Sequence, residues 1–459
     1  MKNKIIKSLT VLILLNFIVY SAFGAAYYSN KKSAAADTNL YVSEKTTGDI
    51  ISVKCTGTDS EFELVKDSDF WKLSGDDSFP ISSDSVERLI EKSGNLAAAR
   101  LISSDGEYSK YGLDTPQQVI TLTDTAGVST TYRIGNFNDN INRYYACEDG
   151  SKKIYIINKS VGDEIIKPLY SYAAAYDLSG LSRATLEEFE CVYGDEKTAV
   201  FKSETDRENP MGSSSPWRFA FPFSSSTFAD TNKVDSLISK LKDAALSQCV
   251  SFEPSKNDTA AFGLETPQAY ISVKYKTDSG EKSAKMYLGK ENADGSAYIS
   301  FEGSSITGLL DSDTAKVIKE YLSCYKYIPQ SVCTVKKDKV ASMEVTLNSV
   351  VHHIEFKENG YTLDGRDCDS ESFEAFFKKL SGIVSSSVSD TAAATGPDSE
   401  SFIVTYHFKD SSYPDAQAVY TPFDENYYTA SSGEIKGRLV NRRSVESVIS
   451  LFETVKQSN

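Results

Sequence analysis

The stretch Tyr111-Gly112-Leu113-Asp114-Thr115-Pro116 has a second version later in the chain, Phe262-Gly263-Leu264-Glu265-Thr266-Pro267. In this pattern the glycine permits a left-handed turn and the leucine inserts into a core. The acid and the threonine can hydrogen-bond the backbone of the turn. The proline can then start an edge strand, where its missing N–H costs no hydrogen bond. The stretch therefore predicts a structural turn that the chain uses twice.

The segments on both sides of this turn are repeated in the same order. Upstream of each copy lie one of the protein's two tryptophans (Trp71 or Trp217), a Phe-Pro pair and an amphipathic run. Downstream lie an alternating run, a segment that ends in Ile-Gly or Leu-Gly, and a further strand-like run. Because order and spacing agree, we expect tandem copies of one unit.

A third, more divergent copy follows. Two strand-like runs between residues 343 and 356 precede Tyr361-Thr362-Leu363, which stands where the other copies have tryptophan. A helical run at 373–380 comes next, and an alternating strand at 402–408 comes later. Between them, Thr395-Gly396-Pro397-Asp398 takes the approximate place of the repeated turn.

Each copy predicts two or three short strands, one amphipathic helix, and three or four more strands. The expected fold class is therefore α+β, with tandem repeated modules, each a mainly antiparallel sheet with one packed amphipathic helix, after an N-terminal transmembrane helix. Helical runs at 161–172 and 313–325 are interpreted as stiff connectors, and the Ser-rich stretches 211–215 and 385–395 as loops. The predicted domains are a cytoplasmic tail and anchor (1–32) and three α+β modules (33–175, 176–325 and the divergent 326–459).

The amino terminus predicts a membrane anchor. Residues 9–28 form an apolar run with Asn16 as its one strongly polar side chain, and about 20 helical residues span a hydrocarbon core of about 30 Å. The preceding lysines favour a cytoplasmic amino end and a body outside the cell. A cleaved signal peptide is the alternative, since small residues in Ala22-Phe23-Gly24 precede Ala25. We favour the uncleaved anchor, and both interpretations export the chain.

Charge and cysteine content limit the classes of partner and ligand. The 459 residues carry a formal net charge of −15, and the first 32 contain bases but no acid, so the rest of the chain is more acidic still. Such a body repels phosphate backbones, and we expect no nucleic-acid partner. The seven cysteines include no C-x-x-C pair, which favours buried thiols over a disulfide framework or a zinc site. A bridge between Cys324 and Cys333 stays open.

The repeated pattern resembles a known family. Trp-x-Leu/Phe, Phe-Pro, a helix, Tyr/Phe-Gly-Leu-Asp/Glu-Thr-Pro, a strand and Ile/Leu-Gly are similar to the bacterial domain-of-unknown-function family 4340 over about residues 60–310. The carboxy-terminal third departs from it, because Gly396-Pro397 lacks the leucine. The resemblance implies an uncharacterised, membrane-anchored protein of a kind often encoded beside ABC-type export systems of the gliding-motility type. It implies no catalytic residues.

The histidines and one acidic loop are the candidate metal sites in the sequence. His352 and His353 are neighbours on a predicted strand and therefore point to opposite faces, while His407 is distant in sequence and without an evident partner. The stretch Asp364 to Asp369 resembles a calcium loop but lacks the acid order and the final glutamate of that motif. We interpret it as a capped turn before the helix at 373.

Some short stretches resemble enzyme motifs. Lys92-Ser93-Gly94 and Ser255-Lys256-Asn257 mimic elements of penicillin-binding enzymes, but in reversed order, and the first is interpreted as a helix carboxy-terminal cap. Asp114 and Glu265 are candidate paired carboxylates of a glycosidase, yet their repetition favours an architectural role. Trp71 and Trp217 are interpreted as core aromatics rather than sugar platforms.

The prediction for function follows from these choices. We predict no catalytic, cofactor-binding or metal-binding residues, and no cofactor. We expect a non-catalytic, single-pass cell-membrane protein whose extracytoplasmic body binds or scaffolds protein partners, with ABC transporter subunits implied by the resemblance. The alternative is a cell-envelope glycan-acting enzyme or carbohydrate-binding protein. A scaffold needs a broad apolar or aromatic surface, to which the pairs Tyr144-Tyr145 and Tyr427-Tyr428 would contribute if exposed, whereas an enzyme needs a cleft of converging acids.

Overall fold

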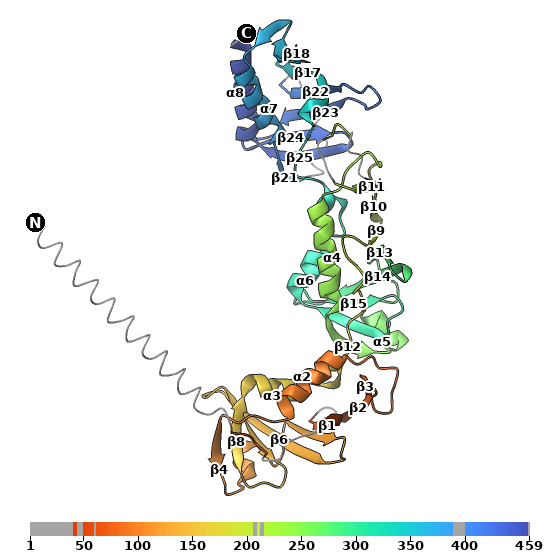
Figure 1. Cartoon of the computed structure of the whole chain (residues 1–459), viewed down its shortest axis with the longest axis vertical. Helices are drawn as coiled ribbons and strands as arrows, with labels where there is room; N and C mark the ends of the chain where they lie inside the picture. The colour runs from red at the N-terminus through yellow and green to blue at the C-terminus, as the bar shows by residue number, and fades with distance from the viewer. Residues whose placement is uncertain are drawn as a thin grey trace, which may run out of the picture. The chain divides into compact units, whose positions relative to one another are not determined.

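The computed structural model describes residues 40–43, 49–58, 61–204, 209–211, 215–388 and 400–457. The chain divides into two compact units, Met1–Ala175 and Tyr176–Asn459 (Figure 1). The predicted anchor at 9–28, most of the Ser-rich stretches and Thr395-Gly396-Pro397-Asp398 lie outside the described residues. Within the described part, no helix combines the length and the apolar character needed to cross a bilayer.

The first unit contains an antiparallel sheet with the strand order β3-β2-β1-β5-β6-β7-β8-β4. Its strands are β1 (Ile50–Gly57), β2 (Glu61–Asp67), β3 (Phe70–Leu73), β4 (Arg100–Ser103), β5 (Gln118–Asp124), β6 (Ser129–Asn138), β7 (Arg143–Glu148) and β8 (Ile154–Asn158). Its helices are α2 (Ser83–Ser93) and α3 (Lys159–Ile165), with 3₁₀ turns η1 (Tyr108–Tyr111) and η2 (Leu169–Tyr172). Helices α2 and α3 pack together, and one core joins α2 to alternate residues of the strands.

The second unit begins with a sheet of the same order, β11-β10-β9-β13-β14-β15-β16-β12. Its strands are β9 (Leu186–Tyr193), β10 (Glu196–Lys202), β11 (Trp217–Phe221), β12 (Gln248–Phe252), β13 (Ala269–Thr277), β14 (Gly280–Glu291), β15 (Ala297–Phe301) and β16 (Ile306–Leu310). Its helices are α4 (Thr231–Ala245), α5 (Lys256–Ala261), α6 (Ser312–Glu320) and the 3₁₀ turn η3 (Cys324–Tyr327).

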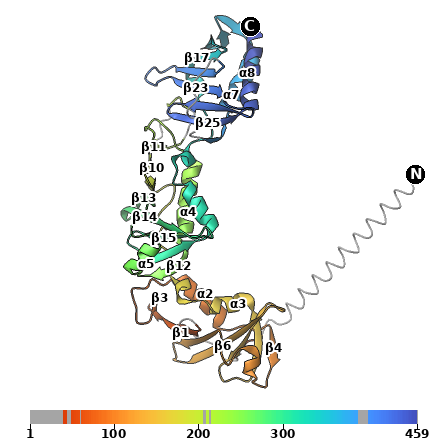
Figure 2. The same ribbon diagram turned by 180° about the vertical axis from the view of Figure 1, so that it is seen from behind.

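A third sheet follows in the same unit, with the order β20-β19-β18-β17-β22-β23-β24-β25-β21. Its strands are β17 (Val340–Leu347), β18 (Val350–Lys357), β19 (Gly360–Leu363), β20 (Arg366–Cys368), β21 (Ser385–Val388), β22 (Phe402–Phe408), β23 (Ala416–Pro422), β24 (Tyr427–Ser432) and β25 (Ile435–Asn441). The 3₁₀ turn η4 (Lys337–Lys339) precedes them, and the helices are α7 (Ser370–Ser381) and α8 (Arg442–Gln457), which pack side by side (Figure 2).

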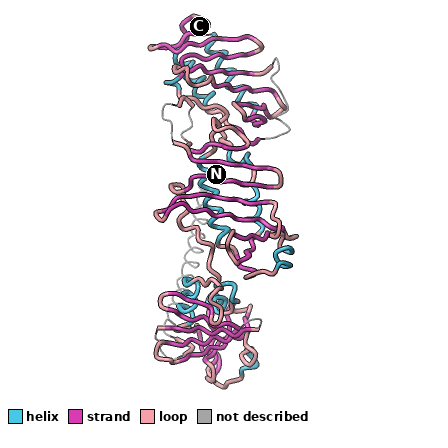
Figure 3. The backbone as a smooth tube through the Cα atoms, turned by 90° about the vertical axis from the view of Figure 1, so that its right-hand side faces the viewer, coloured by secondary structure: helices cyan, strands magenta, loops and turns pink. Residues whose placement is uncertain are grey.

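The three sheets follow one plan, which confirms the predicted repetition of α+β modules. Below, the first copy is β1 to α3, the second is β9 to α6 and the third is β17 to α8. The third copy adds one edge strand, β20, to the common order. In each copy three or four antiparallel strands precede the first helix and five more precede the last helix, and Figure 3 shows these strands and helices in separate colours. Tyr361 faces Phe356 in the hairpin register that Trp71 takes with Lys66, so the tyrosine does stand in the tryptophan's place.

Two predictions about the copies are wrong, the first of them made for the first and second copies only. The runs interpreted as connectors contain a second helix, α3 or α6, that packs against the first helix of its own copy, as α8 does in the third. A further strand, β4, β12 or β21, follows the first helix and closes the far edge of the sheet. Residues 385–388 are therefore strand rather than loop. Whether 176–325 and 326–459 are separate domains stays a prediction, since both lie in the second compact unit.

The first helix of each copy forms for local reasons, as α4 illustrates. Its N-cap, Asp230, accepts hydrogen bonds from the backbone of Asn232 and Lys233, which satisfies donors that the helix leaves free. Its buried residues recur at helical spacing and make one apolar stripe toward the sheet: Val234, Leu237, Ile238, Leu241 and Ala244. The aromatic strand before the helix, β11, and the alternating strand after the turn, β13, contribute the buried side chains of the sheet face that packs against this stripe.

Candidate functional site

The repeated turn is a packing device. Gly112 and Gly263 have φ angles of 68° and 70°, the left-handed region that glycine adopts without strain. The leucines that follow, Leu113 and Leu264, are buried. The glycine that ends the Ile-Gly segment, Gly135, lies against this turn, because a Cβ there would overlap the carbonyl oxygen of Tyr111. The second copy repeats this arrangement, so the residues that the two copies share stabilise the packing of each module.

Two details of the predicted turn need correction. The strand after the proline is not an edge strand, since β5 lies between β1 and β6 and β13 lies between β9 and β14. The acids also differ in their contacts. Asp114 Oδ1 accepts a hydrogen bond from the Thr115 N–H at 3.0 Å. Glu265 instead forms a surface ion pair, in which its Oε1 lies 3.4 Å from Lys256 Nζ. Asp114 belongs to one compact unit and Glu265 to the other.

The tryptophans lie in the cores, as predicted. Trp71 is 4% exposed and Trp217 is fully buried. Trp71 Nε1 donates to Glu87 Oε1 on α2 at 2.8 Å. Trp217 Nε1 is buried and finds no hydrogen-bond partner among the described residues. Neither indole offers a flat face to a sugar ring.

His352 and His353 point to opposite faces of β18, as predicted. The His352 ring packs 5.4 Å from the ring of Phe452 on α8 and its Nδ1 lies 2.8 Å from Asp364 Oδ2. The His353 side chain is 65% exposed on the other face. Partial burial acts to raise the pKa of Asp364, but hydrogen bonds from His352 and from the His353 N–H outweigh it and lower that pKa.

The prediction that His407 lacks a partner is wrong. Its Nδ1 lies 2.8 Å from Asp415 Oδ2, and its Nε2 lies 3.9 Å from Glu344 Oε1. His353 Nδ1 lies 3.3 Å from the same Glu344 oxygen, because β18 and β22 flank β17. Among the residues that the structure describes, however, no group of three or more His, Cys, Asp or Glu side chains is placed to hold a metal ion.

The short motifs that mimic enzymes lie at helix ends. The Gly94 N–H donates to the Ile90 carbonyl at 2.7 Å and closes α2, as the predicted cap requires. Ser255 is the N-cap of α5 and forms a capping box with Asp258. Asp369 caps α7 by accepting from the Ser372 N–H at 2.8 Å, which confirms the capped turn.

The seven cysteines form no disulfide, and all but Cys324 are buried. Cys324 and Cys333 are therefore not bridged. Burial raises the pKa of Cys55 to about 12 and that of Cys147 to about 11, so neither is a thiolate at neutral pH. Within the tyrosine pairs, Tyr144 and Tyr428 are buried rather than exposed.

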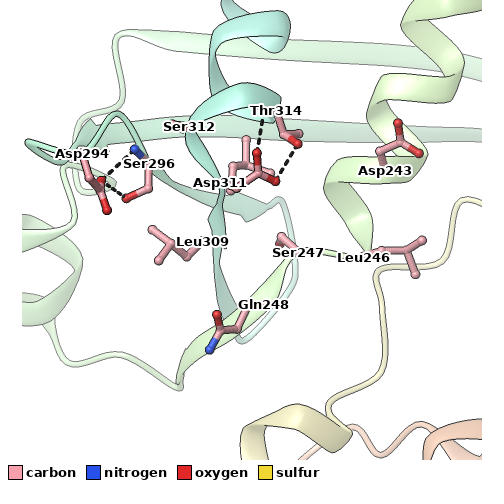
Figure 4. Close-up of a pocket in the computed structure, with 11 residues that line it drawn as sticks. Asp243, Leu246, Ser247, Gln248, Asp294, Ser296, Leu309, Asp311, Ser312 and Thr314 are labelled. Atoms are coloured by element: carbon pink, nitrogen blue, oxygen red, sulfur yellow. Dashed lines mark hydrogen bonds between the residues drawn. The ribbon is translucent and has the colours of Figure 1, made fainter. Parts of the chain in front are cut away.

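One hollow in the second copy is a candidate binding site. It has a volume of about 600 Å³ and lies where α4 ends, α6 begins and the β14–β15 hairpin turns (Figure 4). We call it the α6 notch, and it is lined by Asp243, Leu246, Ser247, Gln248, Asp294, Ser296, Leu309, Leu310, Asp311, Ser312 and Thr314.

The α6 notch presents carboxylates that are fixed in position. Asp294 Oδ1 accepts from the N–H and the hydroxyl of Ser296 at 2.9 and 2.6 Å. Asp311, the N-cap of α6, accepts from the N–H and the hydroxyl of Thr314 at 2.9 and 2.8 Å. These hydrogen bonds lower the pKa of both acids. The notch therefore holds negative charge at neutral pH, and sequence reasoning missed it because its walls come from separate segments.

The third carboxylate and the apolar rim complete the notch. Asp243 Oδ2 lies 2.6 Å from Lys240, one helical turn earlier, so its charge is balanced within α4. Leu246, just past the end of α4, is 75% exposed. The fixed carboxylates and the exposed leucine suit a ligand with a cationic head and an aliphatic stem, or a neutral polar ligand. They disfavour an anionic ligand.

The fold and the repeated turn together define a class of protein. It consists of repeat proteins built from antiparallel α+β modules, in which the residues shared between copies pack within each module. The chain belongs to the family described as domain of unknown function (DUF4340), whose model matches residues 71–225 and 217–400. Each match begins at a tryptophan of the repeat. The second match reaches further than the expected limit at about 310, so the family pattern extends into the third copy. Comparison with curated proteins and with solved structures found no match.

Proposed function

We propose that this protein is a non-catalytic binding or scaffolding component of the cell envelope, anchored in the membrane by residues 9–28. Its body would lie outside the cytoplasm and hold protein partners. Subunits of an ABC-type export assembly are the partners that the family resemblance suggests. The membrane anchor, the location and the partner class all belong to this proposal.

One observation carries the proposal: the residues shared between copies are used for packing. Trp71 and Leu113 are buried in the first copy, and Gly135 lies against the Tyr111 carbonyl of the turn. In the second copy Trp217 and Leu264 are buried, and Gly289 lies against the Phe262 carbonyl. In repeat proteins a common frame presents surfaces that vary from copy to copy, and binding uses those surfaces. An enzyme would instead preserve a reactive constellation, and here Asp114 and Glu265 make ordinary turn and surface contacts.

Affinity purification of the full chain from native membranes tests the proposal. We expect the protein in the membrane fraction, with transporter subunits recovered after mild crosslinking. A chain that lacks residues 1–32 is the control, because without the anchor it should no longer be found in the membrane fraction. Mass analysis of the mature amino terminus separates the anchor from a cleaved signal peptide. Recovery of a monomer without partners that hydrolyses cell-wall glycan would refute the scaffold.

A further inference from the structure

The chain passes from the core of the second copy into the core of the third within a few residues. Ile328 is buried in the second core and Val332 in the third. The connection between them is the three residues Pro329, Gln330 and Ser331. Modules within a chain move relative to one another unless their interface holds them, so the contacts of this connection decide whether the two copies can separate.

The edge of the third sheet holds the middle of the connection. The Gln330 carbonyl accepts a hydrogen bond from the Ser385 N–H at 2.7 Å and another from the Ser385 hydroxyl at 3.1 Å. Ser331 forms an antiparallel β-bridge with Val384, directly before β21. The backbone of the connection is therefore fixed in register against β21.

Arg438 on β25 holds the start of the connection. The residue is 3% exposed, and its Nη1 donates to the Pro329 carbonyl. Its Nε finds no hydrogen-bond partner among the described residues. Burial lowers the pKa of Arg438 to about 10, which still leaves the guanidinium charged at neutral pH. Because a buried charge is costly unless polar groups satisfy it, this guanidinium depends on the position of the Pro329 carbonyl.

Each of the two copies also places an apolar side chain against the core of the other. Ile435, at the start of β25, is 5% exposed and joins the buried cluster that residues 178–328 form. Met211, between β10 and β11 of the second copy, packs against the core of the third and forms an antiparallel bridge with Val335. Beside it, the Lys336 N–H donates to the Pro210 carbonyl at 2.8 Å. Unfolding of either copy would therefore expose apolar surface of the other.

The residues of this joint on β25 are not part of the plan that the copies share. The hairpins before the last helix of each copy can be aligned on glycines with left-handed φ angles: Gly150, Gly303 and Gly433. In this alignment Ile435 corresponds to Ser305 in the second copy and to Lys152 in the first, both of which are exposed. Arg438 corresponds to Gly308 in the second copy. The common fold does not require an isoleucine or an arginine here, which assigns both residues to the joint.

We infer that the second and third copies form one cooperative folding unit, in which the third copy is locked onto the second by this joint. The inference goes beyond the proposed binding function and does not depend on it. The two cores of such a unit open together, because the opening of one removes contacts on which the other relies. A partner that binds both copies would then meet them in one fixed arrangement.

Hydrogen exchange of the full chain in detergent, measured by mass spectrometry over a series of urea concentrations, tests the inference. Peptides from α4 and β13 report on the second core, and peptides from β22 and α8 report on the third. In the wild type we expect both sets of peptides to lose protection at a single urea midpoint. Separate midpoints for the two cores of the wild type would overturn the inference without any variant.

Two variants should uncouple the cores. Ile435→Ser introduces the residue that the second copy has at this position, and Met211→Ser removes the reciprocal contact. In each variant we expect the single midpoint to split into two, and exchange in residues 328–335 to accelerate about tenfold without urea. The matched control is Val350→Ser, which changes a valine of the third copy that is 53% exposed on β18. The control should keep the single midpoint.

Two results with the variants would also overturn the inference. A single midpoint in both Ile435→Ser and Met211→Ser would mean that these side chains do not couple the cores. Equal splitting in Val350→Ser would mean that loss of any apolar side chain separates the copies, so that the joint has no special role. Wild-type protection of α4 and β22 without urea confirms that each variant is folded.

Discussion

Gly135 lies so close to the carbonyl oxygen of Tyr111 that any side chain at residue 135 would overlap that oxygen. The same relationship joins Gly289 to Phe262 in the second copy. Two separate family features, the Gly-Leu turn and the later Ile-Gly or Leu-Gly ending, are thus two halves of one contact. The two glycines lie 23 residues apart in the first copy (135 − 112) and 26 apart in the second (289 − 263), and in both copies the strand, β6 or β14, brings its glycine against the turn.

Alanine at either of these glycines should destabilise its own unit. We expect Gly135→Ala and Gly289→Ala each to lower the free energy of unfolding by about 1–3 kcal/mol, the usual cost of overpacking. Urea unfolding followed by tryptophan fluorescence measures it, since Trp71 lies in the first unit and Trp217 in the second. Gly382→Ala is the control, because a Cβ there meets only ordinary contacts. Equal stability of the variants and the wild type would contradict the packing role.

The two tryptophans should respond differently to the same substitution. Trp71→Phe removes the hydrogen bond to Glu87, whereas Trp217→Phe removes a buried N–H that lacks a partner among the described residues. We expect Trp71→Phe to cost more stability than Trp217→Phe by about 1–2 kcal/mol, although Trp217 is the more buried. Thermal unfolding followed by circular dichroism compares them, and the reverse order would refute this assignment.

The features that could be predicted from sequence are those that the chain repeats. The strands and the helix around the Gly112 and Gly263 turns follow from alternation, helical spacing and duplication, whereas their order in the sheet comes from the structure. Strand β4 was missed because Arg100–Ser103 is short and only partly buried, without alternation. Helix α6 was interpreted as a connector because its short run, with buried Ala315 and Ile318, begins as soon as β16 ends.

The candidate site could not be predicted in the same way. Asp294 lies in a hairpin, Asp311 at a helix start and Leu246 after another helix, and only the folded sheet brings them to one hollow. No motif joins them in the sequence. The sequence interpretation had helical runs at 161–172 and 313–325, but it treated them as connectors and so did not place their starts beside the sheet.

The Asp364 carboxylate predicts a pH dependence of stability. Its pKa is lowered in the folded chain by hydrogen bonds that outweigh its partial burial. A lowered pKa gives stability that is present above the unfolded pKa, near the ordinary aspartate value of 3.8, and that is lost as the pH falls through the folded pKa. Asp364→Asn, which also tolerates the left-handed φ of 50°, should therefore reduce stability at neutral pH and flatten its loss in acid. Urea midpoints across this range test it, and an unchanged acid slope would refute it.

Glu434 makes a contact between the second and third copies within the second unit. Its Oε2 accepts from the Ser224 N–H at 2.6 Å and from the Thr227 hydroxyl at 3.1 Å. Glu434→Ala removes the acceptor of both hydrogen bonds, and we expect a loss of about 1–2 kcal/mol in the local stability of this loop. Hydrogen exchange at residues 224–227 should accelerate, while exchange in the β17–β18 hairpin should stay unchanged. Glu425→Ala removes an equal charge elsewhere in the third copy and should leave the loop protected. Equal protection of the loop in Glu434→Ala and the wild type would mean that these bonds contribute nothing to holding the two copies together.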